Sequence, residues 1–148
     1  MTANYSYREA LPEDIPQLHF IRMAVKENIL SNPDLVKEED YIPFLATKGK
    51  GWIGMFNDHV VGFSIVDLEN HNVWALFIHP DHEGKSVGKT LHKLMLDWYF
   101  KQTSQTIWLS TTPGTRADFF YRKRGWQEKG MHGKEIKFVM NSQDWIDI

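Results

Sequence analysis

The sequence has 148 residues, of which 42% are hydrophobic and 24% charged, and its formal net charge is −2. This composition is typical of a soluble globular protein, so we expect a single domain over residues 1–148 and a cytoplasmic location. The nearly neutral charge gives no indication of a nucleic-acid or membrane partner. The absence of cysteine excludes disulfides, thiol nucleophiles and thiolate metal sites.

The N-terminal part of the chain predicts one strand and two helices. Residues Tyr5–Arg8 alternate as in a short strand. From Pro12 to about residue 30, apolar residues recur at helical spacing and predict an amphipathic helix. A weaker helical pattern covers Leu35–Ala46.

The middle of the chain is rich in strand-forming residues. Trp52–Phe56 and Val60–Leu68 predict two strands, and Asn57-Asp58 between them indicates a hairpin turn. Val73–Ile78 predicts a further strand, which Pro80 ends.

A change to helical spacing follows. An amphipathic helix is expected from Ser86 to about residue 101, and a strand over Thr106–Thr111. Thr115 can cap a helix that continues through Lys123 and ends at Gly125. Residues 126–129 and 135–140 are expected to be strands.

The predicted order of elements is β-α-α-β-β-β-α-β-α-β-β. The strand–helix–strand unit over residues 73–111 should form a right-handed parallel crossover, and the other strands can pair antiparallel. The predicted class is therefore mixed α+β, built on one sheet.

The turn from Glu83 to Lys89 leads from a strand into a helix and contains Gly84 and Gly88. The first N–H groups of a helix have no internal acceptor, and the helix dipole adds positive charge there. Glycine lets the backbone approach a ligand closely, and Lys85 and Lys89 add further positive charge. The turn therefore predicts an anion site, with phosphate as the obvious ligand.

Three phosphate-containing ligands compete for this turn. A Walker A loop requires four residues between its first glycine and Gly-Lys, but three separate Gly84 from Gly88. A dinucleotide-binding fingerprint has a different spacing and belongs near the first strand of a domain. The remaining ligand is the pyrophosphate of coenzyme A.

Two segments resemble motifs of the GNAT family of N-acetyltransferases. Glu83-Gly84-Lys85-Ser86-Val87-Gly88, which follows Ile78-His79-Pro80, is similar to the family signature [Gln/Arg]-x-x-Gly-x-[Gly/Ala]. Ala117–Trp126 is similar to the family's Ala-x-x-Phe-Tyr-x-[Lys/Arg]-x-Gly-[aromatic] segment. The predicted order of elements also resembles that of the family over nearly the whole chain.

The resemblance implies a fold and a reaction. The fold would be a central mixed, mostly antiparallel sheet of about seven strands flanked by four helices, with a parallel strand–helix–strand unit that binds CoA. The reaction would move an acetyl group from acetyl-CoA to a primary amine of a small molecule, protein or peptide, by direct attack in a ternary complex. The resemblance implies no metal and allows a homodimer.

Two residues of the first motif depart from the family pattern. Glu83 stands where Gln or Arg is usual, and Ser86 where Gly is usual. We expect the Glu83 side chain to point outward with its N–H pointing into the site, and Ser86 to have the helical conformation of a first turn. Both departures bear on the affinity for CoA.

The resemblance also implies which residues contact acetyl-CoA. The thioester carbonyl would accept a hydrogen bond from the backbone of Phe77 or Ile78, near a bulge in that strand. The complete expected set is Phe77, Ile78, Glu83, Gly84, Lys85, Ser86, Val87, Gly88, Lys89, Thr111, Ala117 and Tyr121.

Tyr121 is the implied general acid, which would protonate the leaving CoA thiolate. A phenol with a pKa of about 10 is a suitable donor to a thiolate of similar basicity. The alternative is that Tyr121 is a core residue packed beside Phe119 and Phe120.

A general base is harder to assign. The positions at which many family members carry a glutamate correspond to Asn72 and Trp74, and neither can take up a proton. Asn72 could hold a relay water, and the ionisable residues nearby in sequence are Asp67, Glu69, His71 and His79. No base is assigned among these residues, and no metal-binding motif occurs.

The resemblance places the acyl acceptor near Ile29–Tyr41 and Trp126–His132. The first of these segments is acidic and compatible with a cationic amine, although a charged surface loop explains the same residues. Two other functions remain open: a non-catalytic acyl-CoA binding or sensing domain on the same fold, and a nucleotide-binding regulator.

Overall fold

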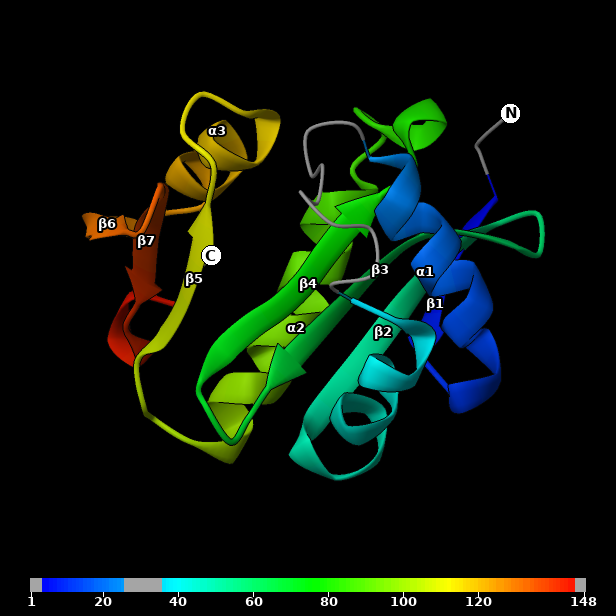
Figure 1. The fold of residues 1–148 in the computed structure, drawn as a ribbon, viewed down its shortest axis with the longest axis horizontal. Coiled ribbons are helices and arrows are strands. Elements are labelled where there is room, and N and C mark those ends of the chain that lie inside the picture. Colours follow the sequence, from blue (N-terminus) through cyan, green and yellow to red (C-terminus); the bar gives the residue numbers. More distant parts are fainter. Residues whose placement is uncertain (1–3, 26–35, 146–148) are drawn as a thin grey trace.

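The computed structural model describes residues 4–25 and 36–145. A sheet of seven strands lies at its centre, in the order β1-β2-β3-β4-β5-β7-β6. Neighbouring strands are antiparallel except β4 and β5, which are parallel. The strands are β1 (Tyr5–Glu9), β2 (Gly49–Phe56), β3 (His59–Asp67), β4 (Asn72–Ile78), β5 (Ile107–Thr111), β6 (Gln127–His132) and β7 (Glu135–Met140). The expected mixed, mostly antiparallel sheet is confirmed (Figure 1).

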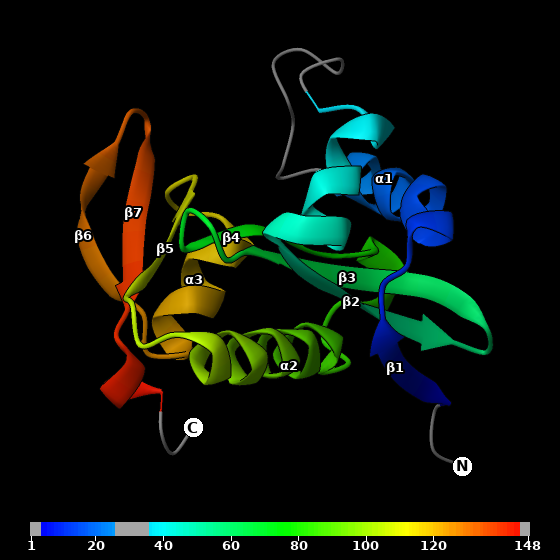
Figure 2. The ribbon, with the colours of Figure 1, turned by 90° about the horizontal axis from the view of Figure 1, so that it is seen from below.

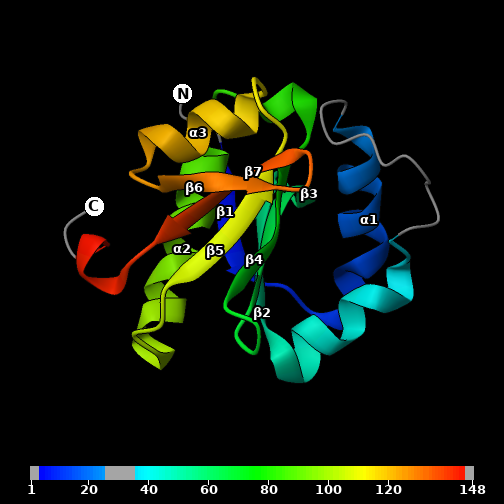
Figure 3. The same ribbon diagram turned by 60° about the vertical axis from the view of Figure 1, so that its left-hand side comes forward.

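Helices cover both faces of the sheet. Helix α1 (Ile15–Ala24) lies on one face, and α2 (Val87–Gln102) and α3 (Arg116–Lys123) lie on the other (Figures 2 and 3). Each face has its own buried cluster: Leu18 of α1 packs with Ile53 and Phe63, whereas Leu91 of α2 belongs to a cluster with Tyr121 and Phe138. The sheet therefore separates two surfaces, and β4 contributes to both of them.

The helical elements before β2 differ in detail from the prediction. Helix α1 ends at Ala24, where an extended backbone at Val25 (ψ 110°) follows, and residues 26–35 lie outside the described residues. Instead of the single helix expected over Leu35–Ala46, the described residues form a 3-10 turn (Glu38–Tyr41) and a π-helical stretch (Phe44–Lys48). Pro43 lies between the two and has no N–H for a continuous α-helical hydrogen-bond ladder.

Two of the predicted turns are confirmed by the backbone. Asn57 and Asp58 have φ values of 50° and 72°, the left-handed pair that a tight hairpin between β2 and β3 requires. At the start of α3 the Thr115 hydroxyl accepts the N–H of Asp118 at 3.3 Å, and Gly125 (φ 95°) follows the helix.

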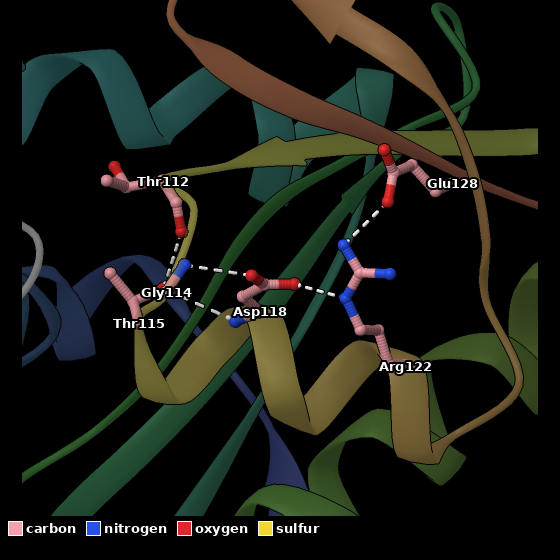
Figure 4. A network of polar contacts seen from close by, with 6 residues as sticks. All are labelled: Thr112, Gly114, Thr115, Asp118, Arg122 and Glu128. Carbon is pink, nitrogen blue, oxygen red and sulfur yellow. Dashed lines mark hydrogen bonds and ion pairs between the residues drawn. The ribbon is translucent and has the colours of Figure 1, made fainter.

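Helix α3 is fixed to its surroundings by a chain of polar contacts (Figure 4). The Asp118 carboxylate accepts the N–H of Gly114 at 2.9 Å and the Arg122 Nε–H at 2.7 Å. Arg122 also donates to Glu128 of β6 at 2.6 Å. The hydrogen bond from Gly114 and the Arg122 charge hold the pKa of Asp118 below its usual value. The helix is thus tied to the loop after β5 and to β6.

Strands β4 and β5 are paired at one register position only, Asn72 with Trp108. There the Trp108 N–H donates to the His71 carbonyl at 2.9 Å, and the Asn72 amide donates to the Trp108 carbonyl at 3.1 Å. Beyond this point the two strands diverge toward their carboxyl ends (Figure 1). One edge of β4 is therefore left without a strand partner in the described part of the chain.

The buried His92 of α2 belongs to an aromatic cluster that joins α2 to β6 and the C-terminal turn. Its ring is 1% exposed, and its Nε2 accepts the Trp126 Nε1–H at 2.9 Å. Burial, assisted by the charge of Arg124, lowers the pKa of His92 from 6.5 to about 3. Hence the folded protein keeps this imidazole neutral under conditions in which the unfolded chain binds a proton.

We therefore expect acid to destabilise the fold through His92. Between pH 6.5 and about 3 the unfolded state binds one more proton, so the free energy of unfolding falls as the pH falls. From pH 6.5 to 4.5 the loss should be about 2 kcal/mol. His92→Gln keeps an acceptor for Trp126 but cannot titrate, so urea unfolding of this variant should depend less on pH. The exposed His59→Gln is the control, and equal pH slopes for wild type and His92→Gln would contradict this account.

Candidate functional site

The turn after β4 presents a continuous run of backbone N–H groups. Gly84 (φ 76°) and Ser86 (φ 66°) are both left-handed, and α2 begins at Val87. The first backbone hydrogen bond of the helix is donated by the Thr90 N–H to the Ser86 carbonyl at 3.1 Å. Among the described residues, no N–H from Gly84 to Lys89 has a hydrogen-bond acceptor. Such a row of donors at a helix start forms a cradle for an anion.

Two exposed lysines add to the positive potential of this cradle. Lys85 lies in the turn and Lys89 on the first turn of α2, and neither forms an ion pair within the described ranges. Lys93, one helical turn later, is instead paired with Asp97 at 2.8 Å. The lysines next to the cradle are therefore available to an anionic ligand, and together with the helix dipole they favour one.

The conformation of Ser86 corrects the expectation of a helical first turn. Its backbone is left-handed (φ 66°, ψ 12°), which costs a residue other than glycine about 1 kcal/mol. The position thus has a conformational reason to be glycine in the family signature. The Ser86 carbonyl accepts both the N–H and the hydroxyl of Thr90, each at 3.1 Å, which stabilises the bend.

Glu83 also lies differently from the expectation. Its N–H donates back to the Pro80 carbonyl at 3.4 Å, so this N–H does not point into the cradle. Its carboxylate lies 3.6 Å from Nε of Arg116, the first residue of α3, instead of pointing away. A Cβ built on Gly84 would lie 3.9 Å from an Arg116 nitrogen. The start of α3 therefore lies over the turn, and Glu83 draws a cation toward it.

Strand β4 offers backbone donors along its unpaired edge. The His79 N–H donates to the Val61 carbonyl of β3 at 2.8 Å. Since successive backbone groups of a strand point to opposite sides, the N–H groups of Leu76 and Ile78 point toward β5 and that of Phe77 toward β3. Of the two expected donors, Ile78 faces the open edge and Phe77 does not.

A bulge in β4 changes which side chains face α1. Ile65 pairs with Ala75 and Val66 with Val73, so Trp74 is the extra residue. As a result, Trp74, Ala75 and Phe77 all pack into the cluster on the α1 side. Ile78 faces the α2 side, where a Cβ built on Gly88 would contact it at 3.5 Å. The bulge that the resemblance implies is thus present, and it brings Trp74 to the α1 face beside Phe77.

Tyr121 projects from α3 into the aromatic cluster beneath the diverging strands. It is 6% exposed, and its ring centre lies 5.5 Å from that of Trp126 and 6.2 Å from that of His92. Burial raises the pKa of Tyr121 well above its usual value, so the phenol stays protonated at neutral pH. Its neighbour Phe119 is 65% exposed, so the three consecutive aromatic residues of α3 are not all part of the hydrophobic core.

The Tyr121 hydroxyl has an unusual polar environment. Within residues 4–25 and 36–145 it forms no hydrogen bond. The unpartnered side-chain atoms that are fully enclosed belong to Arg22 and Arg124, so this hydroxyl is not sealed off. A protonated phenol without a protein acceptor can donate to a ligand.

The remaining two residues expected to contact acetyl-CoA lie near Tyr121 in the chain. Ala117 lies one turn earlier on α3 and is half-buried, and Thr111 ends β5 opposite Ile136.

Most of the polar candidates for a base lie at the other end of β4. Asn72 uses its amide at the β4–β5 junction. Asp67 accepts the N–H groups of Glu69 and Asn70, and His71 shares a hydrogen bond of 2.8 Å with the Tyr99 hydroxyl. These contacts stabilise the β3–β4 turn.

His79 is the candidate that lies beside the cradle. Its ring stacks on Phe20 of α1 with centres 6.3 Å apart. Its Nδ1 accepts the Asp81 N–H at 3.1 Å, so the neutral ring carries its proton on Nε2. In this tautomer His79 is a donor at Nε2 and a poor base.

The two segments expected near the acceptor are only partly described. Of Ile29–Tyr41, residues 29–35 lie outside the described residues, and Tyr41 is fully buried. Of Trp126–His132, Trp126 is buried and β6 is exposed along its length.

In the described ranges no group of three or more His, Asp or Glu could hold a metal ion. None of the described helices has the length and hydropathy of a membrane span.

Comparisons with known proteins agree with this geometry. Residues 14–126 match the model of the Acetyltransferase (GNAT) family. No curated protein matches the sequence.

Solved structures share the fold at low sequence identity. An acetyltransferase of the GNAT family from Staphylococcus aureus Mu50 has a TM-score of 0.79 and 17% identity, covering 94% of this chain and 99% of its own. The PaiA N-acetyltransferase from Thermoplasma acidophilum, in complex with coenzyme A, has a TM-score of 0.75 and 16% identity over 93% and 99% of the chains.

The ribosomal-protein-S18-alanine N-acetyltransferase from Escherichia coli has a TM-score of 0.73 and 16% identity over 93% and 92%. The family match spans most of the chain, and it includes both the turn at the start of α2 and the Tyr121 segment. The chain therefore belongs to the GNAT family of acetyltransferases.

Proposed function

We propose that the protein transfers an acetyl group from acetyl-CoA to a primary amine of a small molecule or a peptide, by direct attack in a ternary complex in the cytoplasm. The observation that carries this proposal is the row of free N–H groups from Gly84 to Lys89 at the end of β4, beside that strand's unpaired edge. An anion cradle and an open strand edge in succession match a ligand that has a pyrophosphate followed by an amide-containing arm.

The contacts with acetyl-CoA follow from this arrangement. The pyrophosphate would accept N–H groups of the cradle, assisted by Lys85 and Lys89. The amides of the pantetheine arm would pair with the open edge of β4, as an added strand does. The thioester carbonyl would then accept the N–H of Ile78 or Leu76, which stabilises the oxyanion that forms during attack. Thr111 and Ala117 would line the opposite side.

Proton transfer would depend on Tyr121. Because burial keeps its phenol protonated, it can give its proton to the sulfur as the thiolate leaves. Strand β4 carries no carboxylate, so the amine must arrive neutral or lose its proton to water. This requirement favours acceptors whose amine pKa is low in the site.

A non-catalytic acyl-CoA binding domain is the alternative function. The observation that favours it is Trp74, which stacks on Phe44 with ring centres 4.3 Å apart at a position where many relatives would carry a base. This alternative predicts binding of acetyl-CoA without turnover.

The proposal is tested by calorimetry with acetyl-CoA and ATP, followed by CoA thiol release against a broad panel of amines. We expect acetyl-CoA but not ATP to bind, and thiol release to depend on at least one amine. Binding without release for every amine would favour the alternative, and binding of ATP alone would overturn both.

Removal of the Tyr121 hydroxyl should affect turnover more than binding. For Tyr121→Phe we expect kcat to fall about 100-fold, because a general acid contributes about this factor, while the Kd for acetyl-CoA changes little. Tyr99→Phe is the matched control, since its hydroxyl bonds to Gln105 and His71 on the other side of α2. Unchanged kcat in Tyr121→Phe would remove Tyr121 from the mechanism.

Neutralising Glu83 should strengthen acetyl-CoA binding. The carboxylate lies next to the cradle and holds Arg116, so Glu83→Gln removes a repulsive charge. A pyrophosphate roughly 8 Å away in water would gain about 1 kcal/mol, or about fivefold in Kd, and salt would reduce the gain. Glu69→Gln, on the exposed β3–β4 turn, should leave the Kd unchanged. Weaker binding in Glu83→Gln would mean that Glu83 is needed to position Arg116.

A further inference from the structure

Arg22, in the last turn of α1, carries a buried charge that has no ion-pair partner in the described part of the chain. The residue is 8% exposed, and its Nε and Nη1 atoms are fully buried without a hydrogen-bond partner. It forms no ion pair within the described ranges. Buried guanidinium groups are almost always paired with an acceptor, because an unpartnered charge in a protein interior is strongly unfavourable. The position of Arg22 therefore requires a separate explanation.

The surroundings of Arg22 are aromatic. Its guanidinium carbon lies 5.0 Å from the ring centre of Trp74 and 5.0 Å from that of Phe77. Both rings belong to β4: Phe77 reaches the α1 face by the ordinary alternation of the strand, and Trp74 reaches it because of the bulge. Ring faces attract a cation, but they do not satisfy its N–H donors. The two rings thus hold the guanidinium in place, Tyr41 shares a side-chain hydrogen bond with it, and the hydrogen bonds of Nε and Nη1 are left to another group.

The other ionisable groups nearby leave the charge of Arg22 unbalanced. Tyr41 is fully buried, and its hydroxyl shares a hydrogen bond of 3.1 Å with Nδ1 of His19. Burial raises the pKa of Tyr41, the charge of Arg22 and a side-chain hydrogen bond with Arg22 oppose that rise, and the charges of Glu38 and Asp40 add to it. Tyr41 is therefore a neutral neighbour at physiological pH, and the two carboxylates act at a distance.

The position of Arg22 relative to the reaction is defined by β4. Trp74 and Phe77 lie just before Ile78, whose N–H faces the edge proposed for the thioester arm. Arg22 lies across the same strand, on its α1 side. A cation over Trp74 thus lies beside the strand that is proposed to hold the thioester arm. Its charge would attract an anionic part of the acceptor and repel a cationic one.

We propose that Arg22 binds a carboxylate of the acyl acceptor, so that the preferred acceptors are amines that also carry a carboxylate, such as amino acids. This inference rests on the proposed acetyl transfer. The guanidinium fork presents several N–H donors in one plane, which suits the two oxygens of a carboxylate. Nε and Nη1 are enclosed in the free protein, so a carboxylate would supply the acceptors that they lack only after the side chains covering them move.

The test compares free amino acids with their carboxamides as acceptors, because each pair shares an amine and differs in the charge near it. We expect kcat/KM of the wild type to be about 100-fold higher for the preferred acids than for their amides. Arg22→Met should remove this preference and leave the Kd for acetyl-CoA unchanged, whereas Arg22→Lys should retain part of it. Equal rates for acids and amides in the wild type would overturn the proposal.

A second readout does not require turnover. If the charge of Arg22 serves a ligand, Arg22→Met should raise the Tm, because the variant loses an unpartnered buried charge. The control is Arg8→Met, which should lower the Tm because Arg8 makes two hydrogen bonds of 2.9 Å to the buried Asp14. With CoA present, N-acetylated amino acids should raise the Tm of the wild type but not that of Arg22→Met. A lower Tm for Arg22→Met would show a structural role for Arg22 and overturn the proposal.

The two readouts separate this inference from the proposed function. Thiol release with acids and amides alike would overturn the role of Arg22 and leave the transferase activity standing. A carboxylate-dependent thermal shift that needs Arg22, without thiol release from any amine, would support the Arg22 site and contradict the transferase activity. Absence of both would contradict both.

Discussion

Strands β4 and β5 run side by side but are joined at a single register position, where Asn72 and Trp108 meet. If the two strands were paired along their whole length, the backbone groups on this edge of β4 would form hydrogen bonds with β5. Because they diverge, the N–H groups of Leu76 and Ile78 point toward a gap in the pairing of the sheet, and an unpaired edge inside a fold is a site for an added strand. The amide of Asn72 closes the base of this divergence, which gives it a structural role.

Strand β5 is paired with β4 at one position only. The part of the structure formed by β5, β6 and β7 therefore needs other contacts to hold it in place. Helix α3 and the aromatic cluster around His92 provide them. Asp118 links the start of α3 to the loop after β5, and Arg122 links its end to Glu128 of β6. The Trp126–His92 hydrogen bond connects this part of the structure to α2. Tyr121 is thereby held by packing on several sides, which is what a positioned proton donor requires.

Sequence patterns predicted the elements well where the signal is local. The hairpin at Asn57-Asp58, the Thr115 cap and the anion-binding turn each depend on residues that are neighbours in the chain. The left-handed Ser86 was missed because serine gives no local sign of that conformation. The Glu83–Arg116 pair joins residues far apart in sequence, so the outward orientation expected for Glu83 was wrong. Pro43 was the available sign that the second predicted helix would be interrupted.

Arg22 was overlooked because an arginine near a helix end usually lies in solvent. Its spacing nevertheless carried a signal: it follows Leu18 by four residues and Ile15 by seven, on the stripe that α1 buries. What no pattern could supply was the pair of rings beneath it, since Trp74 reaches the α1 face only through the bulge in β4. The burial of Arg22 could be inferred from the sequence. That it has no ion-pair partner in the described residues can be seen only in the structure.

Three groups of donors without protein acceptors in the described residues lie around β4. The cradle from Gly84 to Lys89 follows its carboxyl end, its open edge faces β5, and Arg22 lies over its α1 face. Each is unfavourable in the free protein, and the strain at Ser86 adds to the cost. A ternary complex would supply a pyrophosphate, an amide arm and a carboxylate to these three places. Ligand binding should thus stabilise the protein as it completes the site.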